Sequence, residues 1–224
     1  QLVSRPDLNF RGYMGTLAAG TLRPGDTVKV LPSGKQSVVE RIVTFDGDLA
    51  QAQAGQAITV TLQDEIDISR GDLLVAPDAP TAVSKRLLAH LVWMAESPLS
   101  TGRLYDIKLA TKKTQGQFSA IRHRIDVNSL EQHAASELKL NEIGLVELEL
   151  TSAVGVDPYT QVRDSGSFIV IDRLSNVTIG AGMVVEALAD SVETKQVFSE
   201  FELEFNALVR KHFPHWQALD ISQL

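Results

Sequence analysis

The sequence has no cysteine among its 224 residues. Disulfides, zinc–thiolate sites and a thiol nucleophile are therefore excluded, and the absence is compatible with a reducing cytoplasm, where we expect the protein. No apolar run approaches the about 18 residues of a membrane-spanning helix, and residues 1–30 show no secretory signal. We therefore expect no membrane association. The chain also begins at Gln1 without methionine, which we interpret as a fragment boundary.

Positive charge is in deficit, with 21 lysines and arginines against 28 acidic residues and a net charge of −7. Non-specific binding to nucleic acid needs clustered positive charge, so this balance argues mildly against it. Apolar residues make up 44% and charged residues 22%, as in an ordinary globular protein. The length allows one large domain or two small ones.

Motifs for catalysis are also missing. A phosphate-binding loop needs a glycine-rich segment followed by lysine, and the only Gly-Lys pair, Gly34-Lys35, lacks the upstream glycine. The GTPase patterns Asp-x-x-Gly and Asn-Lys-x-Asp do not occur. The five histidines form neither His-x-x-x-His nor His-Glu-x-x-His, and there is no Gly-x-Ser-x-Gly elbow. We predict that this chain holds no catalytic, cofactor-binding or metal-ligating residue.

Closely spaced turn residues divide residues 1–78 into short β-rich runs without an intervening helix. The strands predicted there span 27–31, 38–43, 57–62 and 72–75. Such regular spacing is typical of an all-β barrel, and closure removes exposed strand edges. We assign 1–78 as the first domain, followed by a Pro- and Ala-containing link at 77–84.

The β pattern resumes after this link and then gives way to a helical one. Strands are predicted at 87–94, 105–110, 118–128, 144–150, 167–172 and 177–185. They indicate a second antiparallel domain over 85–188. The remaining 189–224 reads as a polar linker and an amphipathic helix at 199–213, which begins with a capping box and ends before Pro214.

Several strings in the first domain resemble the barrel that follows the GTPase domain in elongation factors. They are Arg11-Gly12-Tyr13-Met14-Gly15, Arg23-Pro24-Gly25-Asp26 and Ile68-Ser69-Arg70-Gly71-Asp72. Glycines there suit positions where strands cross closely or turn with positive φ. The Pro-Gly-Asp string suits a tight turn.

Finer strings resemble one branch of these proteins, the GTPase-type large subunit of bacterial sulfate adenylyltransferase. Three of them are Arg41–Asp48, Ile171–Thr178 and His212-Phe213-Pro214-His215-Trp216. The resemblance implies two tandem antiparallel β-barrels of translation-factor domain II and III type, plus a C-terminal α-helix. Another reading of the same plan is an RNA- or tRNA-binding barrel pair of a translation-factor-type GTPase.

The resemblance also implies a function in sulfate assimilation. In this family the large subunit hydrolyses GTP and drives a small catalytic subunit, which makes adenylyl sulfate and diphosphate from ATP and sulfate. GTP and Mg²⁺ belong to a GTPase domain outside this chain. We therefore expect a heterodimer with the small subunit, a contact with the chain's own GTPase domain, and no catalysis by this fragment alone.

Two features are candidates for a partner interface. Lys108, Lys112, Lys113, Arg122 and Arg124 fall on a predicted hairpin over 105–126 that turns near Gln115-Gly116-Gln117. They form either a basic patch for an acidic partner or a solvated face that protects an edge strand. The C-terminal helix carries an aromatic stripe that packs on its own barrel or on the small subunit. The candidate interface residues are Lys112, Lys113, Arg122, Arg124, Phe205 and Trp216.

Overall fold

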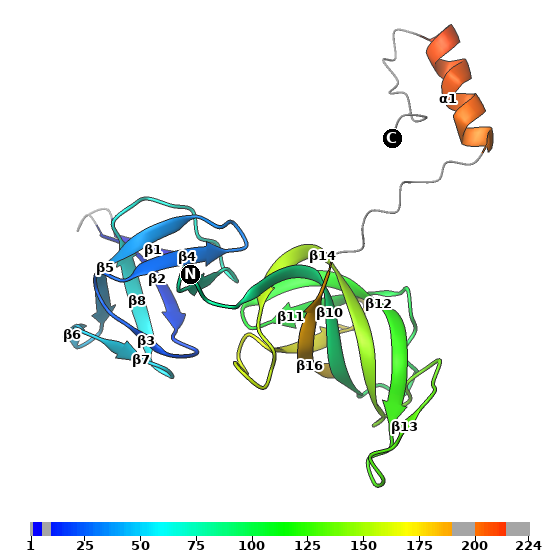
Figure 1. Ribbon diagram of the computed structural model, residues 1–224, viewed down its shortest axis with the longest axis horizontal. Helices are drawn as coiled ribbons and strands as arrows, with labels where there is room; N and C mark the ends of the chain where they lie inside the picture. The colour runs from blue at the N-terminus through cyan, green and yellow to red at the C-terminus, as the bar shows by residue number, and fades with distance from the viewer. Residues whose placement is uncertain (1, 6–9, 190–199, 214–224) are drawn as a thin grey trace. The chain divides into compact units, whose positions relative to one another are not determined.

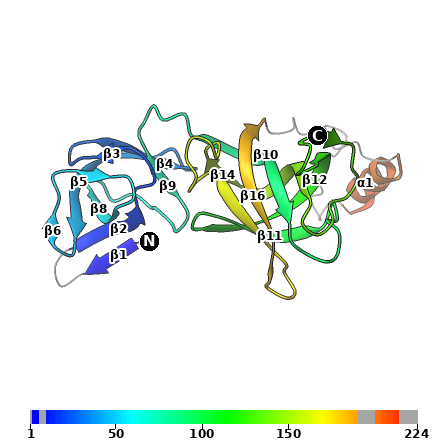
Figure 2. The ribbon, with the colours of Figure 1, turned by 90° about the horizontal axis from the view of Figure 1, so that it is seen from below.

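The structure is a computed structural model that describes residues 2–5, 10–189 and 200–213. The chain divides into two units, Gln1–Ala189 and Asp190–Leu224, and each is described by itself. Figures 1 and 2 show the first unit from two directions, with strands β1–β9 gathered in one barrel and β10–β16 in another. The fold is therefore all-β with a C-terminal helix, as predicted.

The first barrel is built on an antiparallel sheet of order β1-β2-β8-β5-β4-β9, with β6 attached to β5 and a separate ribbon β3-β7. Its strands are β1 (Leu2–Arg5), β2 (Phe10–Thr16), β3 (Thr21–Leu22), β4 (Thr27–Leu31), β5 (Gln36–Thr44), β6 (Gly47–Asp48), β7 (Ala52–Gln53), β8 (Ala57–Leu62) and β9 (Leu73–Val75). Alternate residues of β4, β5 and β8 face inward, as their period of two requires. Ala52 of the ribbon lies in the same buried cluster as Val39 and Ile42 of β5, so both sheets enclose one core.

The second barrel is a closed ladder of order β11-β15-β16-β10-β14-β12, because β11 also pairs with β12. Its strands are β10 (Ala82–Trp93), β11 (Leu104–Leu109), β12 (Lys112–Ile125), β13 (Gln132–His133), β14 (Ile143–Val156), β15 (Ser167–Ile171) and β16 (Thr178–Leu188). Inside, the ring of Tyr105 lies 5.9 Å from that of Trp93 and 5.8 Å from that of Phe118 between centroids. These three aromatic side chains are buried in the core of the barrel, and contacts of this kind between rings add to the stability that their burial gives.

The predicted link at 77–84 is shorter in the structure, because β10 already begins at Ala82. A register shift follows Ser84, whose hydroxyl donates to the carbonyl of Leu188 at 2.9 Å and accepts from the amide of Arg86 at 2.9 Å. This buried serine therefore satisfies backbone groups that the irregular ladder leaves unpaired.

The second unit contains helix α1 (Glu200–His212), close to the predicted span of 199–213. Its last turn is basic, which complements the negative end of the helix dipole. Val209 is buried, whereas Phe205 and Leu208 are more than half exposed. Among the residues described, no helix is long and apolar enough to cross a membrane.

Candidate functional site

The basic hairpin consists of β11 and β12, joined at Ala110 and Thr111. The predicted turn at Gln115-Gly116-Gln117 is wrong, since these residues lie inside β12. A Cβ on Gly116 would lie 2.8 Å from the carbonyl oxygen of Glu149, so this glycine permits two strands to approach closely. The real turn relies on Ala110, which has a φ of 45°.

The arginines of β12 are neutralised by the barrel itself. Arg122 forms an ion pair with Glu147, whose side chain is only 8% exposed and also accepts from Arg86 at 3.1 Å. Arg124 donates to Glu142 at 2.6 Å. The amide of Lys139 and then this guanidinium hold the pKa of Glu142 below its ordinary value. Arg122 and Arg124 therefore tie β12 to its neighbours and do not form a free basic patch.

The lysines at the hairpin tip are less completely balanced. The amino group of Lys113 lies 2.7 Å from the carboxylate of Asp106, and that of Lys112 lies 3.9 Å from Asp72. Within the described part of the chain, Lys108 has no carboxylate within 4.0 Å. Lys108 lies directly opposite Lys113 across the two strands. The tip is thus the most positive part of the hairpin.

The Arg70-Gly71-Asp72 turn of the first barrel packs on this tip. Gly71 has a φ of 96°, and a Cβ there would lie 2.6 Å from the Cα of Lys112. Asp72 closes the turn by accepting from the amide of Ser69 at 2.8 Å. Gly71 therefore meets two needs at once, a positive φ and contact with the backbone of the second barrel.

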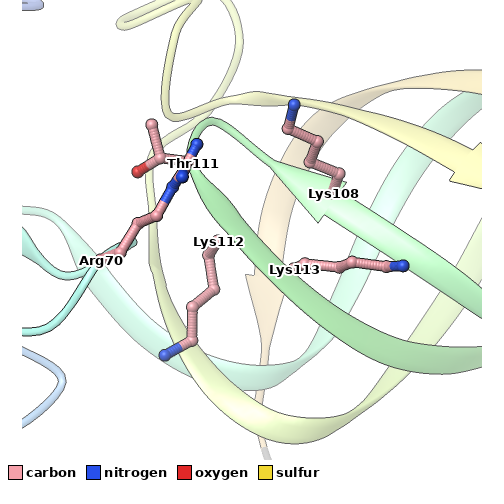
Figure 3. A pocket seen from close by; sticks show the side chains of 5 residues that line it. All are labelled: Arg70, Lys108, Thr111, Lys112 and Lys113. Carbon is pink, nitrogen blue, oxygen red and sulfur yellow. The ribbon is translucent and has the colours of Figure 1, made fainter. Parts of the chain in front are cut away.

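Arg70, Lys108, Thr111, Lys112 and Lys113 line an open cleft of about 470 Å³. Figure 3 shows Arg70 extending from its turn toward Thr111, while the lysines come from the two hairpin strands. The sequence pattern predicts the lysines on one hairpin but does not bring Arg70 to them. The positive-φ glycine beside Arg70 was the local signal that another segment packs closely here. It does not show which segment that is.

Two histidines on the second barrel lie on either side of Leu145 of β14, His90 on β10 and His123 on β12. His90 Nδ1 and His123 Nε2 are buried and have no hydrogen-bond partner. Burial, with the neighbouring His123 adding to it, lowers the pKa of His90. In the described ranges, no group of three or more His, Asp or Glu side chains could hold a metal ion.

The aromatic candidates lie in the second unit. Phe205 is exposed on α1, and Trp216 lies outside the described residues. Their assignment to a partner interface stays a prediction.

Comparison with known proteins identifies the family. Residues 13–75 match the model of elongation factor Tu domain 2, and residues 86–185 match the GTP-eEF1A C-terminal domain-like model. Sulfate adenylyltransferase subunit 1 of Tolumonas auensis is 75% identical over the whole chain. This chain belongs to the sulfate adenylyltransferase subunit 1 family. The family predicted from the sequence strings is therefore confirmed, and the tRNA-binding alternative is not favoured.

Other members of the family match over the same region. Subunit 1 of Aeromonas hydrophila is 66% identical over 99% of the chain, and that of Vibrio cholerae is 58% identical over all of it. The chain spans about half the length of these relatives, 48% for Tolumonas auensis, 46% for Aeromonas hydrophila and 47% for Vibrio cholerae.

The fold has counterparts among solved structures. The structure of Sup35 complexed with GDP matches with a TM-score of 0.76 and 18% identity, over 84% of this chain and 46% of that one. Sup35 complexed with GMPPNP gives a TM-score of 0.72, over 80% of this chain and 44% of that one. At this identity the likeness shows the fold alone, two barrels in tandem.

Proposed function

We propose that this chain is the barrel region of a GTPase subunit that drives adenylyl sulfate synthesis from ATP and sulfate in a small catalytic subunit. The observation that carries the proposal is the 75% identity to sulfate adenylyltransferase subunit 1 along the entire chain. GTP and Mg²⁺ would be bound by the part of the relatives that this chain does not span, since its own residues offer no phosphate loop. The complex would act in the cytoplasm.

The role of the barrels in this proposal is mechanical. Residues 1–78 and 85–188 would be two domains, with 189–224 as linker and helix. The backbone contact between Gly71 and Lys112 supports movement of both barrels together, because it leaves little space for one to slide on the other. A nucleotide-dependent shift of the first barrel would then reach the second, and coupling requires that the partner bind the two positions with different affinity.

The partner surface within this proposal includes the hairpin tip and the C-terminal helix. Lys112, Lys113, Phe205 and Trp216 are its candidate contacts. Arg122 and Arg124 would contribute through the shape of β12, because their charges are already satisfied by Glu142 and Glu147.

A chimaera tests the proposed function. The matching region of Tolumonas auensis subunit 1 is replaced by this chain, and the product is co-expressed with the small subunit of that organism. We expect adenylyl sulfate synthesis that rises on addition of GTP, as with the parent subunit. A chimaera without the small subunit is the control for background activity. A folded, GTP-hydrolysing chimaera that leaves synthesis independent of GTP would contradict the proposal.

A further inference from the structure

The cleft at the hairpin tip holds two like charges, and one of them has a carboxylate partner, since Lys113 lies 2.7 Å from Asp106. Lys108 and Lys113 are directly opposed on β11 and β12. Both point outward, because the flanking Ile107 and Leu109 are buried in the barrel. Directly opposed like charges destabilise a pair of strands. Asp106 offsets the charge of Lys113 and leaves that of Lys108 without a carboxylate within 4.0 Å in the described residues.

The charge balance of the cleft leaves an excess of cations. Its lining contains Arg70, Lys108, Lys112 and Lys113. The ion pairs at this site involve two carboxylates, Asp72 with Lys112 and Asp106 with Lys113, and Asp106 is also shared with Arg173 at 3.7 Å. Across the residues that the structure describes, neither Arg70 nor Lys108 has a carboxylate within 4.0 Å. This local excess stands out on a chain of net charge −7.

The turn that carries Arg70 is held against the hairpin before any ligand arrives. The side chain of Lys112 is only 28% exposed and that of Asp72 only 12%. The backbone of Gly71 also packs directly on the backbone of Lys112. This packing fixes the distance between the turn that carries Arg70 and the hairpin. A fixed distance between the two segments lowers the entropy cost of gathering their side chains around an anion. The hydroxyl of Thr111 adds a neutral donor at the cleft.

We propose that this cleft binds a compact anion with two or more phosphate or sulfate groups, of the size of diphosphate or the triphosphate chain of a nucleotide. Asp72 and Asp106 offset two of the four cations, and the two that remain, Arg70 and Lys108, call for more than the single negative charge of one carboxylate. Arginine offers a fork that fits phosphoryl oxygens, and lysine offers point charges around them. The volume of about 470 Å³ also exceeds the needs of one phosphate ion.

A long nucleic acid fits the cleft less well. Recognition of a phosphate backbone needs a basic stripe that continues along the surface. Beyond the hairpin tip, Arg122 and Arg124 are paired with Glu147 and Glu142, so the run of cations without carboxylate partners ends there. The inference goes beyond the proposed function and does not depend on it.

Calorimetric titration of the 224-residue chain with tripolyphosphate at low salt tests the proposal directly. We expect binding that weakens at least about tenfold in the double variant Arg70→Ala/Lys108→Ala, because the two cations without carboxylate partners are lost. The matched control is Lys35→Ala/Lys139→Ala, which removes the same charge elsewhere and should bind as the native chain does. Lys108→Arg, which keeps the charge, should also bind. Circular dichroism verifies that each variant is folded.

Further titrations separate the sources of the anion. If diphosphate and ATP compete with tripolyphosphate at similar affinity, this supports a site that recognises only the phosphate chain. Much tighter binding of ATP would support a nucleotide whose triphosphate occupies the cleft. The proposal is overturned if native chain and double variant bind alike, if the control pair loses as much affinity, or if only tRNA binds. None of these results depends on adenylyl sulfate synthesis, so failure here is distinguishable from failure of the proposed function.

Discussion

Replacement of Gly71 by alanine should disrupt the contact between the two barrels, and Gly25 provides a matched control. The two glycines have nearly the same φ, 96° and 93°. A Cβ at Gly71 would lie 2.6 Å from the Cα of Lys112, whereas a Cβ at Gly25 would meet nothing within 4 Å. The pair therefore separates backbone strain, which both variants share, from the collision, which only Gly71→Ala has.

The expected magnitudes follow from these two terms. Forcing alanine into positive φ costs about 1–2 kcal/mol, which both variants should lose from the free energy of unfolding. Overpacking against a rigid neighbour adds about 1–3 kcal/mol, and the backbone of Lys112 cannot move aside as a flexible side chain could. The effect of alanine on the unfolded chain is the same in both variants and cancels in the comparison. We expect Gly71→Ala to be less stable than Gly25→Ala by about 1–3 kcal/mol.

Urea unfolding followed by far-ultraviolet circular dichroism measures both free energies. If the two variants differ by less than about 0.5 kcal/mol, the additivity error of such measurements, the contact carries no energy and the reasoning is refuted. A second readout is anion affinity. Gly71→Ala must displace the turn that carries Arg70, so tripolyphosphate binding should weaken in this variant and stay unchanged in Gly25→Ala.

Three further predictions concern the second barrel. Gly182→Ala should lower the free energy of unfolding by about 1–3 kcal/mol, because a Cβ would lie 2.1 Å from the ring of Phe168. The control Gly15→Ala has open space around the added Cβ and should change this free energy by less than about 0.5 kcal/mol. The urea midpoints of the two variants measure the difference. Stability should fall as the pH drops below the ordinary histidine pKa of 6.5, because the pKa of His90 is lowered in the folded state and the unfolded chain takes up the proton first. His90→Leu should flatten this fall, measured by urea unfolding on both sides of pH 6.5. Glu147→Gln should cost about 1–3 kcal/mol in thermal unfolding, since two arginines lose a nearly buried carboxylate.

Each of these has a clear contrary result. Equal losses for the two glycine variants would mean that the Phe168 ring moves aside freely. An unchanged pH slope in His90→Leu would place the proton uptake on other groups. Unaltered melting of Glu147→Gln would show that solvent already screens the ion pairs.

The strands of the first barrel could be predicted because their signals are local. Alternating apolar residues and turn glycines placed β4 and β8 at their observed bounds and β5 within two residues. The helix was found equally well from its capping box and period. The hairpin turn was missed because Gly116 was interpreted as a turn residue, although it serves close strand contact, and Ala110 carries no turn signal.

The candidate site was only half predictable. The cations were visible in the sequence, but the partners that neutralise them lie on other strands. Glu142 directly precedes β14 and Glu147 lies within it, and nothing local marks them as partners of Arg122 and Arg124. The position of Arg70 beside the hairpin likewise depends on how two sheets pack. The periodicity of the sequence carries no information about that packing.

The closed ladder of the second barrel sets an order of folding during synthesis. The first barrel has all its strands once Val75 has emerged, whereas β10 needs β14 on one side and β16, ending at Leu188, on the other. At about 5–20 residues per second, synthesis from the end of β10 at Trp93 to the end of β16 at Leu188 takes roughly 5–20 s. Over that interval β10 has no partner for its second edge. The nascent chain therefore carries a finished barrel beside an apolar strand that is open to wrong pairing.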